Sequence, residues 1–316
     1  MKDIFRLIRL DNLLFLVILT GVMEKWVIAQ LMAQYQLPEP LSWWQLVLLT
    51  AAVVLIAAGG YVINDYFDVK IDQINRPDDL VVTRSVSKQQ AMYIFYGLTA
   101  AGIASGLVLS IVLRSISLAT IFIVTPGLLW FYSASYKRQF MLGNLVVAFL
   151  AAMVPLLPAF AADASIHLQY GEESMAAQYL TNLCFVWTFG FAAFAFFCTW
   201  IREVIKDIED VEGDRELECH TWPVKYGIPA SKIFATVLIV LTMGLLTWIE
   251  FGVFSGPFSW GLLASRFYLF LLLGFVCELW LLWSAKLTQD FRHAQQLMKF
   301  IMFIGMLFSI CVKSLL

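Results

Sequence analysis

Long hydrophobic segments separated by short polar connections run the length of this 316-residue chain. A helix needs about 20 mostly apolar residues to cross a bilayer, and nine segments of the chain reach that length. The pattern therefore predicts an all-α, polytopic membrane protein with nine transmembrane helices. We expect these helices at about 13–33, 43–66, 89–113, 115–134, 143–162, 180–203, 231–251, 262–284 and 296–315.

The composition supports the membrane class. Hydrophobic residues make up 61% of the chain and charged residues only 14%, whereas soluble domains average about 25% charged residues. No linker or low-complexity segment interrupts the helices, so we expect a single domain over 1–316. The first segment is the least regular, because Glu24 and Lys25 interrupt it. These two charges are expected either near the far membrane surface or facing other helices.

The distribution of basic residues predicts the orientation of the chain. Lys and Arg gather in the N-terminal segment and in the connections after helices two, four, six and eight. The opposite connections hold almost none. The segment 34–42 has no Lys or Arg, and 163–179 has none either but contains three acidic residues, Asp163, Glu172 and Glu173. By the positive-inside rule, the N-terminus is expected in the cytoplasm and the C-terminus outside, in a multi-pass protein of the cell membrane.

A polar stripe ends the second hydrophobic segment. Asn64, Asp68 and Asp72 are spaced four residues apart, which places them on one face of a helix. Like charges so placed repel each other, and near an apolar layer each also loses hydration. A divalent cation would relieve both penalties. Asp65 lies about 100° away from this stripe and is expected to matter less.

A second acidic stripe follows the sixth hydrophobic segment. Asp207, Asp210 and Asp214 stand at i, i+3 and i+7, again one helical face, and Gly213 is expected to mark where the helix loosens. The two motif connections, about 64–88 and 203–230, hold thirteen of the 23 acidic residues on the same predicted side. One such cluster alone is most often a solvated helix end, but two with the same spacing favour a shared site.

Two facing carboxylate stripes would form a site of hard oxygen ligands. Mg²⁺ suits it, because Mg²⁺ is commonly held by one or two carboxylates together with substrate phosphates and water. A diphosphate bound in this way becomes a good leaving group. Basic and hydroxyl side chains on the same side could hold the phosphate oxygens, although Lys137 and Arg138 by themselves are more often determinants of topology. The expected catalytic residues and metal ligands are Asp68, Asp72, Asp210 and Asp214, with Asp207 as a further ligand or a neighbour of the metal, and the expected diphosphate contacts are Asn64, Arg9, Tyr132, Ser133, Lys137 and Arg138.

These motifs resemble those of the UbiA-type intramembrane prenyltransferases. Asn64, Asp68 and Asp72 match the family's NxxxDxxxD motif, and Asp210 with Asp214 matches its DxxxD motif. The resemblance implies a ring of nine helices around a central cavity open to lipid, capped by the two motif connections. It also implies Mg²⁺-dependent transfer of a polyprenyl group from its diphosphate to an acceptor.

Within the family, the segments 72–77 and 202–214 look most like the branch that joins geranylgeranyl to geranylgeranylglyceryl phosphate in ether-lipid synthesis. The chain departs from that branch at 78–85 and at 216–220, near the expected acceptor entrance. An aromatic quinone precursor, similar to hydroxybenzoate or dihydroxynaphthoate, is therefore an alternative acceptor. A transporter is a second alternative, but transporters usually place their acids near the membrane midplane in interrupted helices. The oligomeric state is not predicted.

Overall fold

A computed structural model describes residues 2–75, 77, 80–171, 174–253 and 263–315. In these residues the chain is almost entirely helical, and nine helical segments are long and apolar enough to cross a membrane. This confirms the predicted all-α architecture. The segments are Leu10–Gln34, α4 (Trp43–Asn75), α5 (Lys88–Val112), α6 (Ile116–Ala134), α7 (Leu142–Tyr170), α8 (Met175–Glu209), Trp222–Gly252, α11 (Leu263–Ser284) and Thr288–Cys311.

Several helices extend well beyond their hydrophobic segments. α4 continues nine residues past the expected end at 66, and α8 continues six residues past 203, so the acidic motifs begin on helices and not in loops. The last span begins at Thr288, eight residues before the expected start at 296, because its first turns are amphipathic. Hydrophobicity alone underestimates such ends, since polar residues continue a helix without being apolar.

Some spans are built from more than one helical element, and short helices lie between or beside the spans. The first span is built from three consecutive pieces, and the seventh and ninth spans each end in a short irregular helix. The pieces are α1 (Lys2–Leu7), α2 (Leu10–Val22), η1 (Met23–Ile28), α3 (Ala29–Gln34), η3 (Tyr136–Arg138), α9 (Val211–Glu216), α10 (Trp222–Trp248), η4 (Ile249–Val253), α12 (Thr288–Leu307), η5 (Phe308–Cys311) and α13 (Val312–Leu315).

The chain folds into two compact units, each with its own core. The first comprises Met1–Tyr136 and Met153–Gly190, and the second comprises Lys137–Ala152 and Phe191–Leu316. The expectation of a single functional domain over 1–316 stays a prediction.

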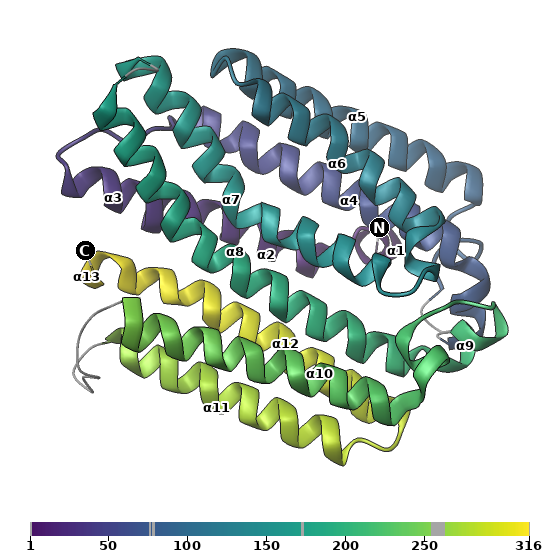
Figure 1. Ribbon diagram of the computed structural model, residues 1–316. Helices are drawn as coiled ribbons and strands as arrows, with labels where there is room; N and C mark the ends of the chain where they lie inside the picture. The colour runs from purple at the N-terminus through teal and green to yellow at the C-terminus, as the bar shows by residue number, and fades with distance from the viewer. Residues whose placement is uncertain (1, 76, 78–79, 172–173, 254–262, 316) are drawn as a thin grey trace. The chain divides into compact units, whose positions relative to one another are not determined.

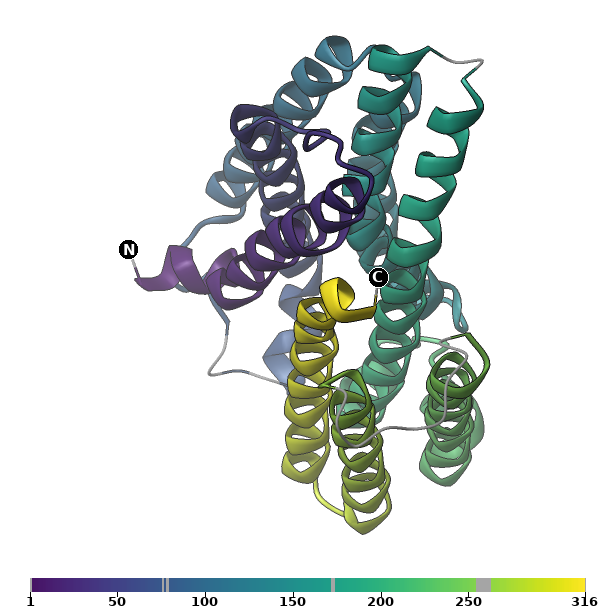
Figure 2. The same cartoon turned by 90° about the vertical axis from the view of Figure 1, so that its left-hand side faces the viewer.

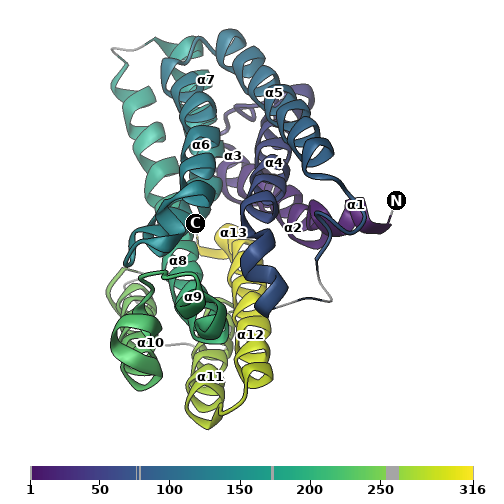
Figure 3. The same cartoon turned by 90° about the vertical axis from the view of Figure 1, so that its right-hand side faces the viewer.

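In the first unit, α4, α5 and α6 lie side by side (Figures 1 and 3). Their contact is close because small residues face large ones: a side chain at Gly106 on α5 would overlap the ring of Phe122 on α6. The turn between these helices lies at Arg114, which has a left-handed φ of 51°, and the hydroxyl of Ser115 caps α6 by accepting from the N–H of Leu118. The predicted break at Arg114 is therefore confirmed.

The first span contains a turn of π-helix, η1, at the two charges that interrupt its sequence. Lys25 pairs with Glu39 in the connection before α4 and lies over the ring of Trp43 at 4.3 Å. Glu24 instead faces other helices and is fully buried. The two alternatives from the sequence thus both occur, one for each residue.

In the second unit, α10, α11 and α12 pack against the part of α8 that follows Phe191 (Figure 1). Figure 2 shows α11 and α12 as two neighbouring antiparallel helices, coloured yellow-green and yellow. The core between the four helices is apolar and includes Ile205, Ile239, Phe275 and Met298. This packing holds the end of α8, and with it the second acidic motif, at a defined place in its unit.

We expect Gly106→Ala to destabilise the first unit. The added methyl group would overlap Phe122, and overpacking of this kind costs about 1–3 kcal/mol. Gly97 on the same helix is the matched control, because nothing lies within 4 Å of a Cβ placed there. Thermal unfolding of the purified protein in detergent should show a lower Tm for Gly106→Ala and an unchanged or higher Tm for Gly97→Ala. Equal Tm values for the two variants would contradict the close contact.

Candidate functional site

The first acidic motif lies on the last turns of α4. Asn64 is buried, Asp68 and Asp72 are half-buried, and all three occupy regular helix, as the four-residue spacing predicted. The side-chain amide of Asn64 donates a hydrogen bond to Oδ2 of Asp68 at 2.8 Å. This bond fixes the position of one carboxylate oxygen of Asp68.

Arg9 adds a positive charge beside this motif. It lies between α1 and α2 in a left-handed conformation, with φ at 51°, which turns its side chain towards α4. Its Nη2 lies 3.0 Å from Oδ1 of Asp65, and its guanidinium lies 4.9 Å from the ring centre of Tyr61. Burial is the largest single effect and lowers the pKa of the Arg9 guanidinium, but the charge and hydrogen bond of Asp65, together with Tyr61 and Asp68, raise it by more in sum, so the net shift is upward.

Asp65 therefore has a partner that the helical-face argument did not anticipate. The stripe predicted which carboxylates share a face of α4, but it carried no information about the N-terminal segment. Asp65 orients Arg9, one of the expected diphosphate contacts.

The connection after α4 folds back onto its own unit. Val81, Val82 and Val86 are buried together with Leu7 and Ile63. The expected loop over 64–88 is thus partly a packed hydrophobic segment, which the valines among its polar residues indicate only in retrospect. Asp78 and Asp79, where the chain departs from the ether-lipid branch, lie outside the described residues.

Aromatic rings cluster next to the first motif. The ring of Phe67 on α4 meets Tyr66 and Trp130 edge-on, with centroids 5.3 and 5.6 Å away, and Phe95 lies 5.4 Å from Trp130. The sequence showed many aromatic residues but did not single out these four. They give the end of α4 a rigid apolar flank beside its carboxylates.

The second acidic motif spans a junction between two helices. α8 ends at Glu209, and Asp210, with φ −92° and ψ 7°, precedes the short helix α9. The break therefore lies at Asp210, and the expectation that Gly213 marks it is wrong, because Gly213 lies inside α9. The interruption is local: the N–H of Asp210 donates to the carbonyl of Lys206 at 2.9 Å, and that of Asp214 to the carbonyl of Asp210 at 3.0 Å.

Two donors that the sequence analysis missed orient this motif. The amide of Asn144, near the start of α7, donates to Oδ2 of Asp207 at 2.9 Å. The hydroxyl of Thr221 donates to Oδ2 of Asp214 at 3.0 Å, and Asp214 is only 6% exposed. The sequence contains only weak signals for these two donors. Asn144 is one amide at the start of a hydrophobic segment, and Thr221 stands two residues before Pro223, where a helix begins.

Glu209 anchors the end of α8 to α12. It is buried, and both Nε and Nη2 of Arg292 lie within 3.2 Å of its Oε1, while Gln295 donates to Oε2. A paired guanidinium and an amide satisfy a buried carboxylate that would otherwise be costly. Glu209 thus has a structural role, which is to hold the end of α8 against α12.

The remaining expected diphosphate contacts differ in how accessible they are. Tyr132 and Lys137 are half-buried, and Arg138 is exposed with its carbonyl accepting from the N–H of His220 at 2.8 Å. Ser133 is 1% exposed, and its hydroxyl donates to the carbonyl of Leu129 at 2.9 Å. That these four residues contact a diphosphate stays a prediction.

The arrangement thus consists of two oriented carboxylate sets, one in each unit. Asn64, Asp68 and Asp72 belong to the first unit, whereas Asp207, Asp210 and Asp214 belong to the second. That the two sets face each other stays a prediction.

The donor chemistry of both sets fits Mg²⁺. Among the described residues, no group of three or more His, Cys, Asp or Glu side chains is placed to hold a metal ion by itself. The ligands offered are carboxylate oxygens, and two of these carboxylates are oriented by amides. An ion that takes few protein ligands and completes its shell with phosphate oxygens and water matches this supply.

Comparison with known proteins agrees with this chemistry. The sequence profile of the UbiA prenyltransferase family matches residues 26–307. A digeranylgeranylglyceryl phosphate synthase from Methanopyrus kandleri is 32% identical over 200 residues, which cover 62% of this chain and 65% of that protein. The aligned region thus spans slightly less than two thirds of that relative's length.

Solved structures show the same fold. A structure described as digeranylgeranylglyceryl phosphate synthase in membranes has a TM-score of 0.62 at 23% identity and covers 99% of this chain and 98% of its own. A UbiA homologue from Archaeoglobus fulgidus bound to GPP and Mg²⁺ has a TM-score of 0.58 at 14% identity, covering 98% and 99%. With its apolar helices, the chain is an integral, multi-pass membrane protein.

Proposed function

Because the chain belongs to the UbiA prenyltransferase family, we propose that it transfers a polyprenyl group from its diphosphate to a lipid acceptor within the membrane. The observation that carries this proposal is the orientation of the acidic motifs. A hydrogen bond fixes one carboxylate of each motif: Asn64, within the first motif, holds Asp68, and Asn144 on α7 holds Asp207. Carboxylates that bind metal ions are typically held in this way.

The chain's own residues have distinct tasks in this proposal. Asp68, Asp72, Asp210 and Asp214 hold Mg²⁺, with Asp207 next to them. When bound, the ion offsets the negative charge that develops on the departing diphosphate. Arg9, held by Asp65, and Lys137 or Arg138 neutralise the remaining phosphate charge.

The transfer itself replaces one C–O bond by another. The bond between the prenyl C1 and the diphosphate oxygen breaks, and the acceptor's hydroxyl oxygen bonds to C1 and loses its proton. The apolar helices keep bulk water away from the allylic cation, which water would otherwise capture.

We propose geranylgeranylglyceryl phosphate as the acceptor and geranylgeranyl diphosphate as the donor. Support comes from the relative in Methanopyrus kandleri, which is named a digeranylgeranylglyceryl phosphate synthase. The segment 202–214, which carries the second motif, also resembles that branch. The product would be an ether lipid with two prenyl chains.

Replacing Asp68 or Asp214 by Asn should lower transfer by more than about 100-fold, because each change removes a charged metal ligand and keeps the side chain's shape. Transfer of radiolabelled prenyl groups by purified protein measures this. Glu216→Gln is the matched control, since Glu216 is exposed on α9. Asp65→Asn should cause a smaller loss, through Arg9. Near-normal turnover in Asp68→Asn or Asp214→Asn would contradict the metal assignment.

A panel of acceptors tests the substrate proposal. Purified protein is incubated with geranylgeranyl diphosphate, Mg²⁺ and, in turn, geranylgeranylglyceryl phosphate, a hydroxybenzoate and a dihydroxynaphthoate. Prenylation of the glyceryl phosphate lipid, detected by mass spectrometry, is the expected result. Prenylation of an aromatic acid alone would assign the chain to quinone synthesis. Transport of a solute in proteoliposomes without Mg²⁺-dependent diphosphate release would remove the enzyme proposal altogether.

We further propose that the acidic motifs face the cytoplasm in the cell membrane. The support is the clustering of Lys and Arg in the N-terminal segment and in the connections of α4, α6, α8 and α11. A reporter that is active only outside the cytoplasm should therefore be active when fused after Leu316 and inactive when fused after Lys137. The opposite pattern would reverse the orientation.

A further inference from the structure

α12 carries a polar stripe into the membrane. Arg292, Gln295, Gln296 and Lys299 stand at i, i+3, i+4 and i+7 and therefore share one helical face. Lys299 is exposed and lies three residues inside the hydrophobic segment expected at 296–315. A charged side chain within a hydrophobic segment is costly and is often functional.

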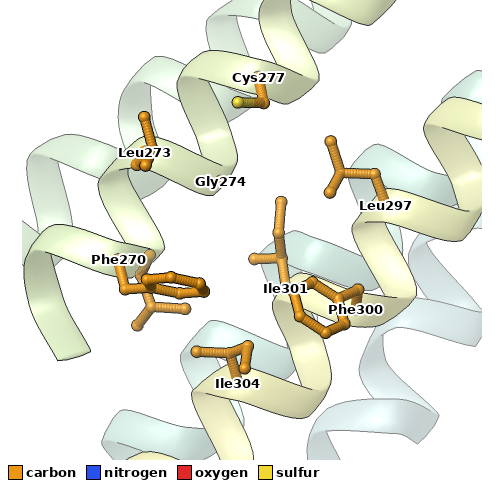
Figure 4. Close-up of a pocket in the computed structure, with 9 residues that line it drawn as sticks. Phe270, Leu273, Gly274, Cys277, Leu297, Phe300, Ile301 and Ile304 are labelled. Atoms are coloured by element: carbon orange, nitrogen blue, oxygen red, sulfur yellow. The ribbon is translucent and has the colours of Figure 1, made fainter.

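The other faces of α12 are apolar. One packs into the core of the second unit through Phe291, Ala294 and Met298. Another forms a groove with α11 of about 160 Å³. Figure 4 shows Phe300, Ile301 and Ile304 from α12 opposite Phe270 and Leu273 from α11. The groove is lined by apolar side chains and the thiol of Cys277 and by none of the stripe residues, so the polar stripe is a separate feature of the helix.

The contacts between α8 and α12 set the level of Lys299. The two helices run antiparallel within the second unit: Glu209 bonds with Arg292 and Gln295 near one end, and the ring of Phe194 lies against Gly305 near the other. On α12, Lys299 lies midway between the residues that contact Glu209 and the residue that contacts Phe194. On α8, the midpoint between Glu209 and Phe194 falls at residues 201–202. Lys299 is therefore level with Arg202.

Two donors at this level of α8 have unmet hydrogen-bonding capacity. Among the described residues, the buried Nε of Arg202 has no hydrogen-bond partner, while its Nη2 lies 2.6 Å from Oε1 of Glu203. The hydroxyl of Thr199, which is 3% exposed, likewise has no partner in that part of the chain. In contrast, the hydroxyls of Thr188 and Thr242 donate to backbone carbonyls four residues earlier. An unmet buried donor costs about 1–3 kcal/mol, so such groups commonly await a ligand.

We propose that Arg202, Thr199 and Lys299 bind the phosphate headgroup of the lipid acceptor. This inference rests on the proposed function and names the part of the acceptor that the enzyme recognises. Arg offers a fork of N–H groups and Lys a point charge, both suited to phosphate oxygens, and Glu203 fixes the direction of the fork. The first residues of the stripe, Arg292 and Gln295, bond with Glu209 of α8, which precedes Asp210 of the second motif. The stripe therefore runs from the second motif towards the hydrophobic part of α12.

The test compares two acceptors that differ only in the phosphate. Full-length protein in nanodiscs receives geranylgeranyl diphosphate and Mg²⁺ with either geranylgeranylglyceryl phosphate or geranylgeranylglycerol. Lys299→Met should raise KM for the phosphate lipid by about 10-fold or more, with kcat nearly unchanged and no effect on the alcohol. Lys299→Arg should keep most of the wild-type KM, and Thr199→Val should raise it by about 3-fold.

Matched controls come from the same helices. Gln296→Met removes polarity beside Lys299 without removing charge, and Thr188→Val removes a hydroxyl that is already bonded within α8; both should leave KM unchanged. Binding of a non-hydrolysable donor analogue with Mg²⁺ should be equal in all variants. An unchanged KM in Lys299→Met, or an equal loss of kcat with both acceptors, would overturn the headgroup site.

A binding measurement separates this inference from the proposed function. Radiolabelled geranylgeranylglyceryl phosphate is bound to the protein without any donor. Wild-type protein that binds the phosphate lipid more tightly than Lys299→Met, yet transfers nothing to it, would retain the headgroup site and remove the proposed function. Wild-type protein that transfers normally while Lys299→Met binds equally well would retain the function and remove the site.

Discussion

Carboxylates at the ends of membrane helices are the constraint on which the rest of this structure depends. An ionised carboxylate beside an apolar layer loses hydration, and several together repel one another. The chain meets this cost with donors: Asn64 for Asp68, Arg9 for Asp65, Asn144 for Asp207 and Thr221 for Asp214. Each donor satisfies part of one carboxylate. These contacts hold the carboxylates in defined orientations, which is the basis of the proposed chemistry.

The scaffold around the motifs serves the same requirement. The guanidinium and amide that hold Glu209 tie the end of α8 to α12, and the buried valines after α4 tie the first motif's connection to its own core. A metal site must be held within a fraction of an ångström, so its carboxylates need rigid helices behind them. The long helices α4 and α8, which continue past their hydrophobic segments, provide that support.

Polar groups inside the spans are not all equivalent. Glu24 lies fully buried in a turn of π-helix, while Lys25 next to it pairs with Glu39 outside the span. Arg202 and Lys299 lie at one level on neighbouring helices of the second unit, beside an unbonded Thr199. The pair with Glu39 accounts for Lys25, whereas both carboxylate oxygens of Glu24 lack a hydrogen-bond partner among the described residues. The buried donors of Arg202 and Thr199 also lack partners within that part of the chain, in a place where an anionic lipid headgroup would satisfy them.

The sequence by itself determined the number of spans, their approximate places and the residues of both acidic motifs, because hydrophobic length and helical periodicity are local properties. It could not determine that α8 breaks at Asp210 and not near Gly213, since that depends on backbone angles at one residue. Nor could it show that Arg9 reaches Asp65, that Asn144 reaches Asp207, or that the hydroxyl of Ser133 is already used. Those contacts join residues up to 63 positions apart or depend on a side-chain rotamer, so only the tertiary structure decides them.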